Sequence, residues 1–256
     1  MTSRRELREA GHRAKQRRRR PRVTVAGVLG ELLVTAGFLV LAFVGWQLWL
    51  NDIIVGQQLE AESLEITQEW DKNIGEAVRG DTDDPPVMEP VADAERFALL
   101  IVPRFGDDYY RPIAEGVGTW SVLNKNNLGH YPGTQMPGEV GNFAIAAHRK
   151  AYGGNLENIH KLQIGDTVYV ETQDGWYGYV FRNLEYVTPR GVGVIDPVPQ
   201  MDGVSPEERL ITMTTCNPFF STAERIIAYG VFDQFYPRGR DRRDGAGVVV
   251  TDRGDN

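Results

Sequence analysis

The chain contains one cysteine, Cys216, and it lies at the end of a predicted strand. Residues 211–215 are rich in β-branched side chains and residues 226–232 in apolar ones, so each segment is predicted to be a strand. Pro218 has no N–H to donate and disfavours helix in the residue before it, so strand pairing should stop directly after the cysteine. Because Arg225 begins the second strand, antiparallel pairing would bring its guanidinium beside the sulfur.

A cysteine that acts as a nucleophile needs a partner that can take its proton. The reactive form is the thiolate, and a free thiol with a pKa of roughly 8.5 is only slightly ionised at neutral pH. His148 ends an alternating predicted strand, residues 142–147, and precedes a loop, so it matches the position predicted for Cys216. We therefore expect two strand ends to form one site. The alternative is a histidine that merely ends a strand and bonds to loop carbonyls.

Two other histidines lie downstream of the apolar N-terminal segment. His130 falls in a long loop rich in Gly and Pro, where it would line a substrate groove or face water. His160 lies in a short predicted helical turn, residues 155–162, and a surface position is the default. A zinc site of His130, His148 and Cys216 is conceivable, but no close ligand pair such as CxxC or HxxxH accompanies them. No metal site is predicted.

A long apolar segment near the N-terminus predicts a membrane anchor. Residues 32–50 carry no formal charge, and with residues 23–30 they are long enough to cross the hydrocarbon core. Residues 1–22 hold ten basic and two acidic side chains, which places them in the cytoplasm by the positive-inside rule. Trp46 and Trp49 fit an anchor at the outer interface. The rest of the chain is then predicted to be extracytoplasmic, held by a single-pass anchor.

Two alternatives to this topology are less favoured. A cleaved signal peptide usually has a shorter apolar run, and no small-x-small site follows the run before Asn51. A basic tail that binds nucleic acid is the second alternative, but the cluster stands directly against an apolar span, where topology is the commoner reason for it. We expect an uncleaved signal anchor and no nucleic-acid partner.

The segment after the anchor is predicted to be an amphipathic helix followed by a linker. Residues 51–79 carry apolar side chains at spacings of four and seven, namely Val55, Leu59, Ile66, Trp70 and Ile74. Such a helix would lie along the following domain or lift that domain off the bilayer. Residues 80–90 are acidic and rich in proline, as a linker would be. Their aspartates, Asp81, Asp83 and Asp84, lack the full spacing of a calcium loop.

Short apolar runs separated by turn residues fill the rest of the chain and predict an all-β domain. These runs are residues 97–102, 142–148, 167–172, 176–187, 210–215 and 225–232. Asp174 and Gly175 would supply a tight hairpin turn between the third and the fourth run. The predicted organisation is a cytoplasmic arm (1–22), a transmembrane anchor (23–50), a helix and linker (51–95), a catalytic domain (96–237) and a flexible tail (238–256).

Three of these segments resemble the motifs of sortases, the membrane-anchored cysteine transpeptidases of Gram-positive cell envelopes. They are His148 in AIAAHRKAYGG, Cys216 in TTCNP and Arg225 in ERIIAYG. The longer segments GHYPGTQMPGEVGNFAIAAHR and TTCNPFFSTAER are similar in particular to class E sortases. The resemblance spans residues 97–232. It implies an eight-stranded β-barrel with short helices, preceded by one transmembrane helix, and a catalytic set of Cys216, His148 and Arg225.

The resemblance also implies a reaction and its partners. A sortase cleaves a secreted protein between Thr and Gly of a C-terminal LAxTG or LPxTG-type signal and joins the Thr carbonyl to an amine of a cell-wall precursor, lipid II. No cofactor is expected. Tyr131 matches a loop tyrosine associated in class E with LAxTG preference, and its other role would be packing against Pro132. Thr215 would orient the substrate or the backbone, although as a strand residue it would equally serve in pairing alone, and His130 is a further candidate for substrate contact. Met213 stands where relatives often have Leu, which fills a similar volume.

Two other interpretations use the same residues. An extracytoplasmic enzyme of the L,D-transpeptidase kind, which acts on peptidoglycan itself, would also need Cys and His, but the ordered element from TTCNP to Arg225 does not favour it. A non-catalytic scaffold on the membrane with an inert thiol is the second. The reactivity of the thiol separates the scaffold from both enzymes, and a sorting-signal peptide separates the two enzymes.

Overall fold

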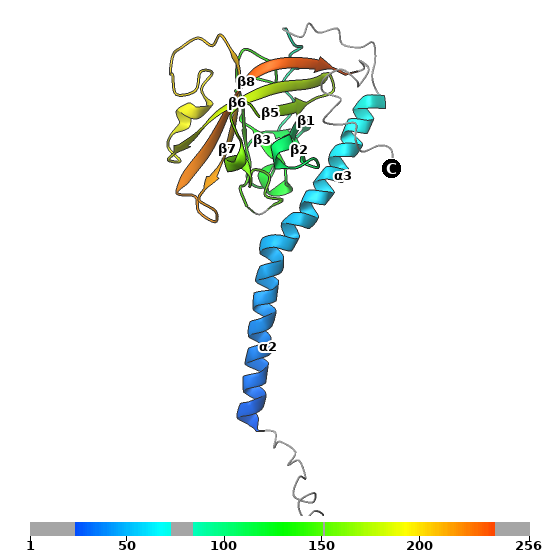
Figure 1. Ribbon diagram of the computed structural model, residues 1–256, viewed down its shortest axis with the longest axis vertical. Coiled ribbons are helices and arrows are strands. Elements are labelled where there is room, and N and C mark those ends of the chain that lie inside the picture. The colour runs from blue at the N-terminus through cyan, green and yellow to red at the C-terminus, as the bar shows by residue number, and fades with distance from the viewer. Residues whose placement is uncertain (1–23, 73–83, 151, 239–256) are drawn as a thin grey trace, which may run out of the picture. The chain divides into compact units, whose positions relative to one another are not determined.

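The computed structural model describes residues 24–72, 84–150 and 152–238 (Figure 1). By its internal contacts the chain forms two compact units, Met1–Trp46 and Gln47–Asn256. Within the first unit lies the helix α2, Val25–Gly45, whose most apolar window has a mean hydropathy of 2.2. Its 21 residues correspond to about 30 Å, enough to cross a membrane, so the helix is compatible with a single-pass anchor. A short π-helical segment, Trp46–Leu50, follows α2 in the chain.

Several segments named in the sequence analysis lie outside the described residues. They are the basic arm 1–22, the stripe residue Ile74, two aspartates of the linker (Asp81 and Asp83) and the tail residues 239–256. The predicted cytoplasmic location of the arm therefore stays a prediction.

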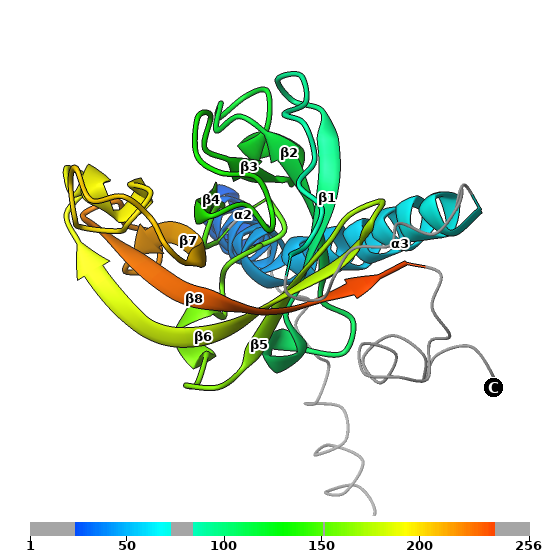
Figure 2. The ribbon, with the colours of Figure 1, turned by 90° about the horizontal axis from the view of Figure 1, so that it is seen from above.

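The second unit is built on a closed barrel of eight strands, as the resemblance implied. The strands are β1 Arg96–Ile101, β2 Tyr110–Glu115, β3 Leu128–His130, β4 Gly141–Ala146, β5 Thr167–Glu171, β6 Gly175–Val187, β7 Arg209–Asn217 and β8 Glu224–Pro237. Their order around the barrel is β1-β2-β3-β4-β7-β8-β6-β5. The pairs β2–β3 and β4–β7 are parallel and the others are antiparallel. The long strands β6 and β8 run side by side along most of their length (Figure 2).

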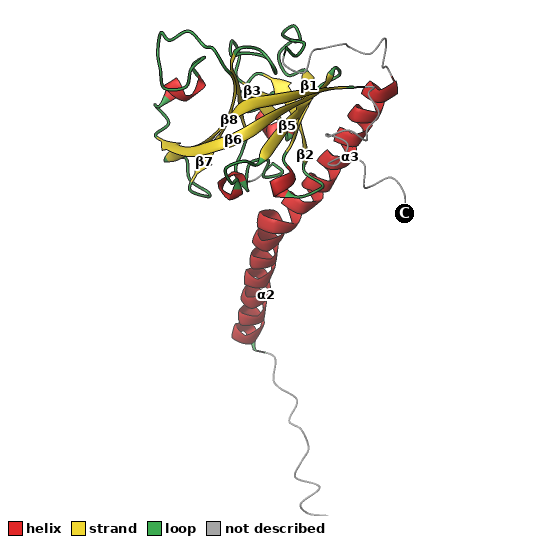
Figure 3. Cartoon of the chain, turned by 45° about the horizontal axis from the view of Figure 1, so that its top comes forward, coloured by secondary structure: helices red, strands yellow, loops and turns green. Residues whose placement is uncertain are grey.

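Loops with short 3₁₀ helices connect the strands (Figure 3). These helices are Pro103–Phe105, Leu123–Lys125, Ile159–Lys161 and Val192–Ile195. Large apolar side chains from different strands fill the barrel interior, among them Leu100, Ile113, Phe143, Tyr177 and Phe235. Burial of this apolar surface holds the strands in one register and so fixes the positions of their ends.

The predicted hairpin between β5 and β6 is present, but its glycine has a different role. Gly175 is the first residue of β6, and its carbonyl accepts a hydrogen bond from Thr172 N–H over 2.8 Å. A Cβ atom at Gly175 would lie 2.2 Å from the carbonyl oxygen of Tyr236 on β8. The backbone φ of Gly175 is 152°, which L side chains rarely adopt. A glycine is therefore required at position 175 because the backbone approaches β8 closely there, and not because the residue lies at the centre of the turn.

The predicted amphipathic helix is α3, Asn51–Lys72, and it lies against the barrel beside β2 (Figure 1). Leu59 is buried there, but its buried neighbours on the helix are Ser63 and Thr67. Thr67 donates to the carboxylate of Glu171 over 3.2 Å. The buried face of α3 is thus partly polar, and of the two predicted roles the structure favours packing along the domain.

Two predicted boundaries move because polar contacts tie flanking residues to the barrel. Arg238, assigned to the tail, is 3% exposed and forms ion pairs of 2.6 Å with both Asp71 on α3 and Glu171 on β5. In the predicted linker, Asp84 pairs with Arg209 over 2.9 Å and Pro85 is buried. The barrel unit therefore includes Arg238 and the residues from Asp84 onward.

Candidate active site

The register of β7 and β8 places Arg225 directly across from Cys216. The predicted antiparallel pairing is confirmed, but pairing stops one residue later than predicted: β7 ends at Asn217, which pairs with Glu224, and Pro218 follows. Cys216 is a free thiol and is partly exposed. The nucleophile candidate thus sits at one end of the closed barrel, and the neighbouring strand carries a permanent cation.

Parallel pairing of β4 with β7 brings His148 to the same end of the barrel. Ala146 pairs with Thr214, and Ala147 N–H donates to the Thr214 carbonyl over 3.1 Å. Thr215 Oγ1 donates in turn to the Ala147 carbonyl over 2.7 Å. His148 follows Ala147 and Cys216 follows Thr215, so the register brings the backbones of both residues to the same end of the barrel.

Thr215 is 2% exposed, and its hydroxyl is occupied by the Ala147 carbonyl. Its side chain therefore joins β7 to the segment between β4 and His148. Of the two roles considered for Thr215, this contact favours orienting the backbone over touching a substrate.

The ring of His148 is held by a residue that sequence reasoning did not identify. His148 Nε2 lies 2.9 Å from Oδ1 of Asn124, which belongs to the 3₁₀ helix between β2 and β3. The Tyr152 ring lies 5.1 Å from the imidazole, between centroids. Burial lowers the pKa of His148, so the neutral imidazole is favoured near pH 7. The asparagine stands in an ordinary polar turn, and nothing in the sequence distinguishes it.

Two arginines lie near Cys216 in the fold, Arg225 across from it on β8 and Arg149 in the loop after β4. Arg225 Nη1 donates to the carbonyls of Thr222 and Glu224 over 3.1 and 2.9 Å, which holds the guanidinium near the start of β8. Arg149 Nη1 donates to the Cys216 carbonyl over 3.4 Å and to the side chain of Asn217. Arg149 was not predicted to belong to the site.

Tyr131 reaches the nucleophile strand through its hydroxyl. Tyr131 OH lies 3.0 Å from Thr214 Oγ1, two residues before Cys216. The side chain is half-buried. The contact adds to the packing against Pro132 that was considered for this tyrosine, and it links the loop after β3 to the candidate site.

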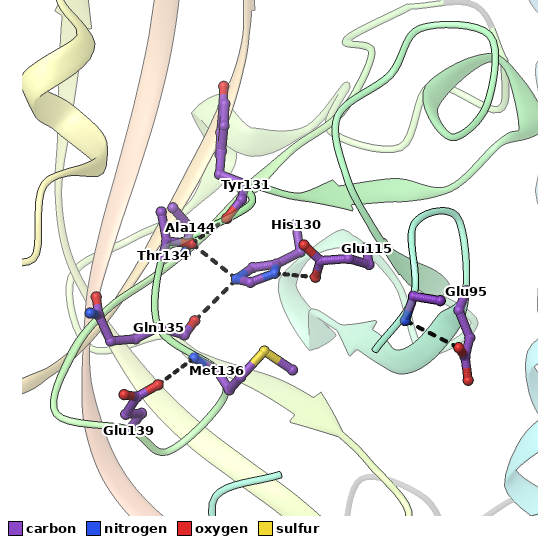
Figure 4. A network of polar contacts seen from close by, with 10 residues as sticks. Glu95, Glu115, His130, Tyr131, Thr134, Gln135, Met136, Glu139 and Ala144 are labelled. Carbon is purple, nitrogen blue, oxygen red and sulfur yellow. Dashed lines mark hydrogen bonds and ion pairs between the residues drawn. The ribbon is translucent and has the colours of Figure 1, made fainter. Parts of the chain in front are cut away.

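The structure places His130 in the barrel core. It is 2% exposed, and its Nδ1 lies 2.6 Å from Glu115 Oε2 (Figure 4). Its Nε2 lies 3.1 Å from the Gln135 carbonyl and 2.9 Å from Thr134 Oγ1, and the ring stacks on Phe143. His130 therefore neither lines an open groove nor faces water. Figure 4 shows the side chain of Tyr131 pointing away from it.

The structure also describes His160 and the arrangement of side chains that could bind a metal ion. His160 is exposed, as expected, with its ring 6.2 Å from that of Phe219. Within residues 24–72, 84–150 and 152–238, no group of three or more His, Cys, Asp or Glu side chains is arranged to hold a metal ion.

Comparison with known proteins matches residues 100–233 to a family model, the sortase domain. Sortase SrtE1 of Streptomyces coelicolor is 34% identical over 242 residues, covering 92% of this chain. The match spans 65% of that relative's own length, just under two thirds. Sortase SrtE2 of the same organism is 29% identical, covering 87% of this chain and 88% of its own.

Solved structures agree with the family match. The SrtA sortase from Actinomyces oris has a TM-score of 0.61 and 40% identity, over 68% of this chain and 98% of that chain. Sortase E1 from Streptomyces coelicolor, crystallised with a tripeptide in the active site, has a TM-score of 0.55 and 37% identity, over 60% and 98%. The family model covers more than half of this chain, and the motifs it shares lie at one edge of the same eight-stranded barrel. This chain therefore belongs to the sortase family.

Proposed function

We propose that this protein is a class E-like sortase, a membrane-anchored cysteine transpeptidase. It would cleave secreted proteins between Thr and Gly of a C-terminal LAxTG or LPxTG-type signal and join them to an amine of a cell-wall precursor, lipid II. The observation that carries the proposal is the register of β7, which has Arg225 across from Cys216 on one side and the His148 strand on the other. The similarity to SrtE1 and SrtE2 supports the class E assignment.

Cys216 is the proposed nucleophile. Its thiolate would attack the Thr carbonyl carbon, and collapse of the tetrahedral intermediate would release the glycine amine and leave a thioester. The amine of the precursor would then attack the thioester, form the new amide and release the thiolate. The partly exposed position of Cys216 gives a peptide access to the sulfur.

His148 is the proposed proton carrier for both steps. As imidazolium it would protonate the departing glycine amine, and as neutral imidazole it would accept a proton from the incoming amine. Because Asn124 faces Nε2, we assign proton exchange to Nδ1. Burial lowers the pKa of His148, which favours the neutral form needed for the second step.

Arg225 is the proposed stabiliser of the oxyanion or of the bound peptide backbone. Its guanidinium cannot lose its charge near neutral pH, and its two backbone contacts place it near the start of β8. Loss of one oxyanion donor costs about 2.7 to 4 kcal/mol in other enzymes, which corresponds to roughly a hundredfold to thousandfold in rate. We expect Arg225→Ala to lose activity on that scale.

Tyr131 is the proposed determinant of the signal preference. Its hydroxyl contacts Thr214 on β7, so the loop after β3 touches that strand two residues before the proposed nucleophile. The proposed arrangement in the cell is a cytoplasmic N-terminus, α2 as the anchor, and the barrel outside. The apolar length of α2 supports the anchor.

The test uses the full chain in detergent micelles, an LAxTG peptide and an amine donor, with Cys216→Ala as the control. Mass spectrometry should detect cleavage between Thr and Gly and transfer to the amine with the wild-type chain alone. Product from Cys216→Ala would remove Cys216 from the mechanism. Absence of product from the wild type, with a thiol that alkylates readily, would show that the substrate class is wrong.

A further inference from the structure

We propose that Arg149, the residue after His148, is a positioning residue that locks the nucleophile strand end and the β7–β8 loop to the loop that carries His148. The inference deepens the proposed transpeptidase and rests on it. Arg149 is 8% exposed, although it carries a permanent charge at the edge of the barrel.

The contacts of Arg149 converge on the residues around the thiol. Its Nη1 donates to the carbonyl of Cys216 over 3.4 Å and to Oδ1 of Asn217. The centre of its guanidinium lies 4.2 Å from the centroid of the Phe219 ring, in a cation–π contact. One side chain therefore fixes the nucleophile backbone, the last residue of β7 and the first aromatic residue of the β7–β8 loop.

Asn217 extends this connection to the strand that carries Arg225. Its Nδ2 donates to Glu224 Oε2 over 2.9 Å, and Glu224 is its partner across the β7–β8 pair. The path Arg149–Asn217–Glu224 thus runs beside the catalytic candidates in the same order, since each of its members adjoins one of them in the chain. A displacement of the Arg149 guanidinium would therefore change the positions of His148, Cys216 and Arg225 relative to one another.

Stability alone does not account for a charge at this place. Burial lowers the pKa of Arg149, which reports the cost of removing the guanidinium from water. Its Nε is buried and has no hydrogen-bond partner among the described residues. An apolar side chain of similar volume would avoid both costs. We therefore attribute the presence of an arginine at this buried position to its hydrogen bonds with the end of β7.

The titratable groups around Arg149 come from three elements. Tyr186 on β6, Glu157 in the loop before the 3₁₀ helix Ile159–Lys161, and Cys216 on β7 each act on its charge. On the loop of Arg149 itself, Lys150 forms an ion pair with Glu157 over 3.0 Å. Arg149 is thus near enough to Cys216 for its hydrogen bond to hold the backbone and for an ionised Cys216 to interact with its charge.

The test compares Arg149→Met, which keeps the apolar volume, with Arg149→Lys, which keeps the charge but loses the planar fork. Arg190→Met is the matched control, because Arg190 is exposed. All variants are full chains in detergent. The first measurement is the second-order rate of alkylation of Cys216 by iodoacetamide, which needs no sorting signal. The second is the steady-state turnover of an LAxTG peptide, which separates kcat from KM.

We expect Arg149→Met to alkylate at least about fivefold more slowly than wild type and to lower kcat by on the order of tenfold to a hundredfold. KM should change by less than about threefold, because the peptide contacts are unaltered. Arg149→Lys should fall between the two, and Arg190→Met should match wild type.

Alkylation and kcat within about twofold of wild type in Arg149→Met would overturn the inference. If Arg149→Met does not fold, as judged by its thermal midpoint, Arg149→Lys decides: a wild-type kcat in that variant rejects the positioning role. If the wild-type chain does not turn over the peptide, the alkylation rates still test the role of Arg149, while the proposed substrate fails separately.

Discussion

Replacing Arg238 with Met should strongly destabilise the barrel unit, because this arginine neutralises a buried carboxylate. Glu171 is 1% exposed and accepts from Arg238 Nη2 over 2.6 Å. The same Nη2 donates to the Thr172 carbonyl over 2.8 Å, and Nη1 pairs with Asp71 over 2.6 Å. The guanidinium also lies 4.5 Å from the Trp176 ring.

The size of the effect follows from what the substitution leaves behind. In Arg238→Met the Glu171 carboxylate would keep one hydrogen-bond donor among the described residues, the hydroxyl of Thr67 at 3.2 Å, and would lose its countercharge. Breaking a buried ion pair from one side costs about 3 to 5 kcal/mol. Adding Glu171→Gln removes the stranded charge, so the double variant should recover about 1 to 3 kcal/mol of the free energy of unfolding relative to additivity.

The loss should also depend on pH in a defined direction. Burial raises the pKa of Glu171, and the charge of Arg238 opposes this. A carboxyl with a raised folded pKa stabilises the fold fully below its unfolded pKa, and that contribution disappears as the pH rises through the folded pKa. Without Arg238, the pKa of Glu171 would be raised further. The destabilisation by Arg238→Met should therefore be smaller at about pH 5 than at about pH 8.

Urea unfolding followed by tryptophan fluorescence measures this prediction, with Arg104→Met as the control. Arg104 pairs with Asp166 over 2.6 Å but is 40% exposed, so its loss should leave the unfolding midpoint almost unchanged. Equal midpoints for the two variants, or a larger loss for Arg238→Met at the lower pH, would refute the reasoning.

Two further predictions concern the candidate site. Asn124→Ala removes the hydrogen-bond partner of His148 Nε2, so the imidazole loses its orientation and kcat should fall by about tenfold with a smaller change in KM. Steady-state kinetics with an LAxTG peptide measures this effect, and an unchanged kcat would count against a role for Asn124. Tyr131→Phe removes the contact with Thr214, worth about 1 kcal/mol, and should change the LAxTG to LPxTG ratio of kcat/KM by about fivefold; an unaltered ratio rejects the selectivity role.

Strands with clear apolar patterns could be predicted from the sequence, and short or interrupted ones could not. β7 and the start of β8 were predicted to within two residues because Pro218 marks the gap between two β-rich runs, but β8 continues to Pro237, beyond the predicted end at residue 232. β2 was missed since Pro112 stands inside it, and β3 was missed since it has three residues. Their place in the barrel depends on neighbours distant in the sequence, which a local pattern does not contain.

The candidate site was predictable only as far as strand ends could be recognised. Cys216 and His148 each end a predicted strand, but Asn124 comes from a polar turn whose position depends on the closed barrel. His130 was placed in a loop because Gly and Pro surround it, whereas it forms the end of β3 and pairs with Ile145. Arg238 was assigned to the tail because the charges after it dominate the local composition.

The parallel pairing of β4 with β7 is made by backbone groups, so it does not depend on which side chains the two strands carry. Six consecutive pairs, from Gly141 with Arg209 to Ala146 with Thr214, hold the ends of the two strands beside each other. The loops that follow are different, because the first of them carries His148 and Arg149, and Arg149 contacts Asn217 and Phe219. A protein engineer who exchanges these loops between sortases would therefore have to transfer both loops together, whereas the paired strands could stay as they are.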